Sequence, residues 1–156
     1  RHPLPTTALL AASLAAAVCA AGPAKGQDGD QKALQGKWAI TRAEAGGRPD
    51  KEAIGLVYTF EGDRLTMATP RPVTMQATFR LEATKTPKRM TFTILDEAKE
   101  EVVNTAIYDL DGDTLKLCGT WNSRVGVRHP FPKGFGTAKG DSSSYLLVLA
   151  RQKADK

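Results

Sequence analysis

Two segments of the chain, YTFEGDRLTM at residues 58–67 and YDLDGDTLKL at residues 108–117, share one pattern and decide the fold. Each places a Gly-Asp pair between two runs in which apolar and polar residues alternate. Because glycine adopts the positive φ that two-residue hairpin loops require, we expect each segment to be a β-hairpin that turns at its Gly-Asp pair. The expected cross-strand pairs on one face of the sheet are Phe60 with Leu65, Tyr58 with Met67, Leu110 with Leu115 and Tyr108 with Leu117.

The same alternation continues on both sides of these hairpins, from residue 34 to residue 151. One apolar face per strand is typical of antiparallel sheets that bury a single side. We count about eight strands, of which the last three cover 102–110, 114–119 and 144–151. The pattern predicts an all-β fold, an eight-stranded antiparallel up-and-down barrel whose closure leaves no exposed sheet edge. At most one short helix is expected, a turn at 49–54.

The first part of the chain has a different composition. Residues 8–21 read ALLAASLAAAVCAA, an apolar run without charge that follows Arg1. This arrangement is typical of a secretory signal peptide, and the run is shorter than the about 20 residues of a membrane-spanning helix. We therefore expect a signal peptide at 1–26, a flexible tether at 27–33 and one barrel domain at 34–156, in a secreted or periplasmic protein. The alternative is a lipid anchor at Cys19, for which the preceding Val18 is a poor fit.

The remaining chain is only mildly basic. Loss of Arg1 and Lys25 with the signal peptide lowers the formal net charge from +5 to +3. Nucleic-acid binding requires a concentrated basic stripe, so no nucleic-acid partner is expected, and neither is membrane insertion after cleavage. Basic residues in two loops either form an anion-binding rim or are solvated charges; they are Lys85, Lys88, Arg89, Arg124, Arg128, Lys133 and Lys139.

No group of residues matches a catalytic or metal-binding pattern, so we expect no enzymatic activity, no cofactor and no metal. A nucleophilic Cys118 would need a base, and His129 is the only histidine outside the signal segment. Cys118 alternates with the apolar residues of its strand, which favours an inert thiol on the opposite face. The three acids at 109, 111 and 113 lack the spacing of a calcium loop.

The first and last strands resemble those of a known family. The sequence LQGKW at 34–38 resembles the Gly-x-Trp signature of lipocalins and other calycins, in which the tryptophan lies across one barrel end beneath a basic residue. Arg151, which ends YLLVLAR, stands at the place of that basic residue. The resemblance implies a lipocalin-like barrel with a structural clasp of Gly36, Trp38 and Arg151. Because closure pairs the last strand with the first, we expect the Arg151 guanidinium within about 6 Å of the Trp38 ring.

A second resemblance covers residues 34–151. The set LQGKW, FEGDRL, TPKRMTF, YDLDGDTLKLC and LLVLAR is similar to a small secreted domain of planctomycete bacteria. No activity is assigned to that family, so the resemblance implies a fold and a compartment only.

The expected interior gives the leading functional hypothesis, a non-enzymatic barrel that binds a small apolar or amphipathic molecule. Methionines give a pliable apolar lining, and large apolar side chains are expected to face inward. The rival is a structural or protein-interaction module of the cell envelope with a filled core. The long loop at 120–143 is expected to act either as a lid or binding loop, or as a plug on the barrel mouth. The candidate lining residues are Phe60, Met67, Met75, Phe79, Met90 and Phe92.

Overall fold

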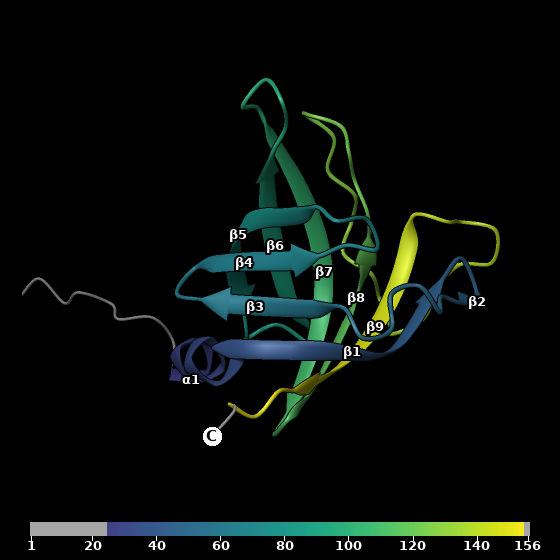
Figure 1. The fold of residues 1–156 in the computed structure, drawn as a ribbon. Coiled ribbons are helices and arrows are strands. Elements are labelled where there is room, and N and C mark those ends of the chain that lie inside the picture. Colours follow the sequence, from purple (N-terminus) through teal and green to yellow (C-terminus); the bar gives the residue numbers. More distant parts are fainter. Residues whose placement is uncertain (1–24, 155–156) are drawn as a thin grey trace, which may run out of the picture.

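The computed structural model describes residues 25–154, which form one helix followed by nine strands (Figure 1). The segment predicted as a signal peptide lies outside the described residues, apart from its last two positions. The elements are α1 (Lys25–Leu34), β1 (Gly36–Ala45), β2 (Arg48–Pro49), β3 (Val57–Glu61), β4 (Arg64–Ala68), β5 (Thr74–Glu82), β6 (Lys88–Leu95), β7 (Glu101–Asp111), β8 (Thr114–Thr120) and β9 (Ser144–Arg151).

The sheet closes into a barrel because its first strand pairs with its last. β1 pairs with β3 on one side and with β9 on the other, which places Trp38 opposite Arg151. The strands from β3 to β9 then follow one another in chain order, each antiparallel to its neighbour. β2 is a two-residue addition that pairs with the end of β1. The predicted closed, eight-stranded, up-and-down barrel is confirmed, with β2 as an extra strand.

Both hairpins have the predicted register. β3 pairs with β4 so that Phe60 lies opposite Leu65, and β7 pairs with β8 so that Tyr108 lies opposite Leu117. The glycines of the two loops have φ angles of 60° and 55°, in the left-handed region that favours glycine. The Gly-Asp pairs therefore set the register of half the strands in the barrel.

The prediction of a flexible tether at 27–33 is wrong, because these residues belong to α1. The helix lies against one end of the barrel (Figure 1), where Leu34 is fully buried. The Asp30 carboxylate accepts hydrogen bonds of 2.8 Å from both Lys88 Nζ and Tyr108 Oη. The polar, glycine-containing helix sequence has little intrinsic helix preference, so these tertiary contacts stabilise it. Residues 49–54, where a helix was expected, instead end β2 and form turns.

The long connection between β8 and β9 packs on the outer wall of the barrel. Thr105 Oγ1 of β7 donates to the carbonyl of His129 at 2.9 Å, and the Cys118 thiol of β8 lies 3.3 Å from the carbonyl oxygen of Gly136. Thr105 and Cys118 are buried even though they point away from the barrel interior. The middle of this connection therefore covers β7 and β8 from outside, whereas its two ends, at Trp121 and at Ser142 and Ser143, border the barrel interior.

Candidate functional site

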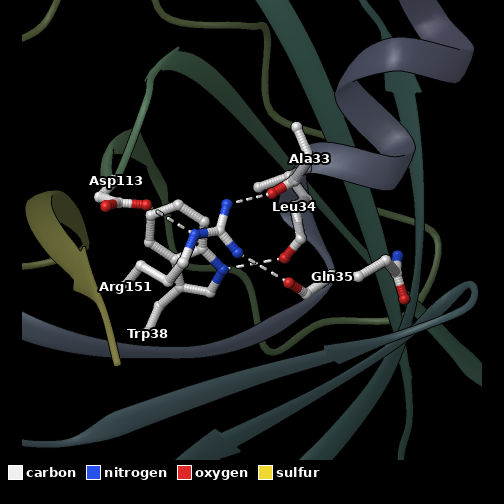
Figure 2. Close-up of polar contacts among 6 residues, drawn as sticks. All are labelled: Ala33, Leu34, Gln35, Trp38, Asp113 and Arg151. Atoms are coloured by element: carbon white, nitrogen blue, oxygen red, sulfur yellow. Dashed lines mark hydrogen bonds and ion pairs between the residues drawn. The ribbon is translucent and has the colours of Figure 1, made fainter. Parts of the chain in front are cut away.

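One end of the barrel is closed by Trp38 and Arg151 (Figure 2). The Arg151 guanidinium carbon lies 4.3 Å from the centroid of the Trp38 ring, inside the range expected from the sequence. The indole is fully buried beneath it. Arg151 Nε also forms a 2.9 Å ion pair with Asp113 Oδ1 in the hairpin between β7 and β8. The contact between Trp38 and Arg151 thus joins β1 and β9, the two strands whose pairing closes the sheet.

The same two side chains hold the C-terminal end of α1. Arg151 Nη1 donates to the carbonyl of Gln35 at 2.9 Å, and Arg151 Nη2 donates to the carbonyl of Ala33. Trp38 Nε1 donates to the carbonyl between them, that of Leu34, at 2.8 Å (Figure 2). The last carbonyls of a helix lack partners within the helix and carry partial negative charge, so a guanidinium group suits this position. The helix therefore covers the barrel end as part of the clasp.

Gly36 allows the chain to turn from α1 into β1. Its φ of 112° is one that residues with a side chain rarely adopt. A Cβ at this position would lie 3.7 Å from Arg151 Nη1, an ordinary contact distance. The requirement for glycine thus comes from the backbone conformation.

Next to the clasp, the barrel interior is filled. The rings of Phe60 and Phe79 meet edge to face, with centroids 5.2 Å apart and planes at 88°. Met90 is fully buried beside them in the same core. These three residues were expected to line a ligand site, but they fill the closed half of the barrel.

The other half of the barrel is hollow. A cavity of about 300 Å³ lies there, at the lower end of the range for small-molecule sites. Met67, Met75 and Phe92 line it, so three of the six predicted lining residues border this space. Its apolar wall is completed mainly by Ile40, Ala53, Leu56, Leu65, Leu117, Trp121 and Leu147.

The polar side chains that line this cavity belong to Asp50, Tyr58, Thr69, Ser142, Ser143 and Tyr145. Burial raises the pKa of Tyr58 to about 12. Burial, followed by the proximity of Tyr58 and Cys118, raises the pKa of Tyr145 well above its usual range, so both phenols are neutral at ordinary pH. Among the described residues that line the cavity, Asp50 alone carries a full charge.

The barrel wall has a gap beside the cavity. β5 and β6 pair only from Thr78 and Thr93 onward, toward the closed end. Beyond that point the two strands diverge and border a groove of about 870 Å³. Met75 lines both the groove and the cavity.

Cys118 and two of the seven loop bases have structural partners. Burial raises the pKa of the Cys118 thiol, and the loop carbonyls cover it. Of the basic residues, Lys88 pairs with Asp30, and the Arg89 guanidinium carbon lies 4.6 Å from the centroid of the Phe131 ring. Within residues 25–154, no three His, Cys, Asp or Glu side chains are grouped as metal ligands would be. The same part of the chain contains no helix with the length and apolar character needed to cross a membrane.

Several cavity residues were not predicted as lining. Tyr145 and Leu147 alternate along β9, and Tyr58 belongs to a recognised strand, so strand periodicity alone would have found them. Asp50 and Trp121 come from segments outside the predicted strands. No sequence signal placed Asp50 at the cavity, because connections have no fixed period, whereas Trp121 belongs to the loop expected to be a lid, a binding loop or a plug.

Comparisons of the chain with protein-family models, with curated proteins and with solved structures find no match. The class of protein is therefore defined by its fold and its site alone. It is a closed β-barrel with one end sealed by a helix and a Trp–Arg clasp, and with an apolar cavity toward the other end.

Proposed function

We propose that this protein is a secreted, non-enzymatic barrel that binds a small apolar or amphipathic molecule in the cavity. The observation that carries the proposal is the unequal filling of the interior. Aromatic and methionine side chains fill the closed end, whereas a predominantly apolar space of about 300 Å³ remains at the other. A structural module would gain stability by filling that space, because unfilled apolar volume weakens a core. A relationship to lipocalins is part of the proposal and rests on Gly36, Trp38 and Arg151.

The three methionines of the chain provide the test. Met67 and Met75 line the cavity, whereas Met90 is buried in the filled half and serves as an internal control. We expect titration of [¹³C-methyl]methionine-labelled protein with 2-isopropenylnaphthalene, a neutral hydrocarbon, to shift the Met67 and Met75 signals saturably and to leave Met90 in place. No shift, or an equal shift of all three signals, would contradict binding at this site.

A matched pair of variants separates cavity binding from surface binding. Ala45 of β1 lines the cavity, so the side chain introduced by Ala45→Phe should occupy part of the cavity and weaken binding of the probe. Ala39 lies in the same strand between the buried Trp38 and Ile40, so its side chain faces outward and Ala39→Phe should leave binding unchanged. Native mass spectrometry of protein purified from its own host then identifies the natural ligand. If no ligand co-purifies and no probe binds, the rival reading, a module with no ligand, is correct.

Secretion is the second part of the proposal. We expect the mature chain to begin between Ala21 and Asp28 and to carry no lipid. Such a start retains Asp30, which holds α1 to the barrel through Lys88 and Tyr108. N-terminal sequencing and intact-mass measurement of the exported protein test this, and a diacylated Cys19 would contradict it.

A further inference from the structure

Tyr145 places a hydroxyl without a hydrogen-bond partner beside the cavity. The residue lies near the start of β9, opposite Gly119 of β8, and it lines the cavity. Its Oη is fully buried and has no hydrogen-bond partner among the described residues. A buried hydroxyl without a partner is unfavourable because it has lost its hydrogen bonds to water. The other such atom in the described part of the chain is Nδ2 of Asn104, which does not border the cavity.

Gly119 explains where this hydroxyl lies. A Cβ at Gly119 would be 2.6 Å from Tyr145 Oη and 2.8 Å from the carbonyl oxygen of Thr105, so the phenol tip occupies the space that a side chain would fill. The hydroxyl gains no hydrogen bond there. Because the tyrosine borders the cavity, an acceptor on a bound molecule can draw the tip away from Gly119. The new hydrogen bond exists only in the bound state, so it contributes directly to affinity.

The charges around the cavity restrict the kind of acceptor. Within residues 25–154, no lysine, arginine or histidine lines the cavity, and the one charged group there, Asp50, is an acid. A carboxylate ligand would lose its hydration without meeting a cation, which is strongly unfavourable. A ketone, ester or ether oxygen avoids this loss and still accepts a hydrogen bond.

Resting on the proposed function, we propose that the cavity selects a neutral, mainly apolar ligand with one hydrogen-bond acceptor, which takes its hydrogen bond from the Tyr145 hydroxyl. The apolar body of the ligand packs among Met67, Phe92 and Leu117. Tyr145 is the specificity-determining residue, and fatty-acid-like anions are excluded.

Three probes with one naphthalene body test the proposal by calorimetric titration at pH 7. They are 2-acetylnaphthalene, with a ketone; 2-isopropenylnaphthalene, with a methylene group in place of the ketone oxygen; and the anion 2-naphthoate. Tyr145→Phe should weaken binding of the ketone by about two- to twelve-fold, the range for one hydrogen bond. It should leave the affinity for the alkene unchanged. Wild-type protein should bind 2-naphthoate at least about tenfold more weakly than the ketone.

Tyr58→Phe tests the competing donor, because Tyr58 also lines the cavity and its oxygen is not among the fully buried, unpartnered atoms. If Tyr58→Phe, and not Tyr145→Phe, lowers the ratio of ketone to alkene affinity, the hydrogen bond comes from Tyr58 and the inference is wrong. The ligand-free Tyr145→Phe protein should have the same or a higher Tm, because the change removes an unpartnered buried hydroxyl.

The outcomes separate this inference from the proposed function. If the ketone and the alkene bind but Tyr145→Phe weakens both equally, or if 2-naphthoate binds as tightly as the ketone, the inference is wrong and the binding function stands. If Tyr145→Phe lowers the Tm of the free protein, the hydroxyl already has a partner such as an internal water, and the inference is wrong. If no probe binds the wild type, both proposals are wrong.

Discussion

Replacement of Arg151 by alanine tests the closure of the barrel at its most connected side chain. The guanidinium group stacks on Trp38, donates to the carbonyls of Ala33 and Gln35, and pairs with Asp113. We expect Arg151→Ala to uncouple α1 from the barrel end while the strands still pair.

The size of the effect follows from these contacts. A cation–π contact contributes roughly 0.5–2 kcal/mol. Each hydrogen bond to a helix carbonyl contributes about 1 kcal/mol, at the low end for a charged donor because the Arg151 side chain is 27% exposed. The ion pair adds little, since the Asp113 side chain is 73% exposed. The expected loss is therefore about 2–4 kcal/mol, which is less than the roughly 5–15 kcal/mol of a typical domain.

Urea unfolding followed by tryptophan fluorescence measures this loss. The midpoint should fall by about 1–2 M with an unchanged slope. Asp113→Ala is the matched control, because it removes only the exposed ion pair and should cost less than about 1 kcal/mol. Arg151→Lys keeps the charge but not the planar donor fork, so its stability should fall between the wild type and Arg151→Ala. Equal stability of Arg151→Ala and Asp113→Ala would refute the clasp.

Three further measurements examine other parts of the barrel. In hydrogen-exchange NMR, the Gln76 amide should exchange much faster than that of Ala77. The Phe79 amide donates to the carbonyl of Asp63 on the β4 side, and alternate amides of a strand point the same way, so the Ala77 amide points toward β4 and the Gln76 amide into the gap between β5 and β6. Equal protection would mean that the gap is closed. All three tyrosines have a raised pKa, that of Tyr58 to about 12, so stability should be complete below pH 10 and fall as pH rises toward 12; tyrosinate absorbance of the folded protein at pH 10 would contradict this. The Cys118 thiol should react with a disulfide reagent only as fast as the loop opens, and immediate reaction would show that the loop does not cover it.

The sequence by itself determined the strands, their register and the closure. The side-chain period of a strand is two, so a Gly-Asp loop with apolar residues at matched distances, as in residues 58–67, permits only one pairing that buries one face. The same logic brought Trp38 and Arg151 together, because a closed meander must pair its last strand with its first. These features depend on local strand geometry and on topology, and the alternation of apolar and polar residues in the sequence predicts both.

Only the tertiary structure decided how the interior and the two ends are used. The helix preference of residues 25–34 is weak, and α1 forms where the barrel offers Lys88, Tyr108 and Arg151 as partners. Alternation shows that Phe79 and Met67 both face inward, but not that one is packed in the core and the other borders a cavity. The empty volume is what remains after the strands, the turns and the long connection have packed together, so no single segment of the sequence specifies it.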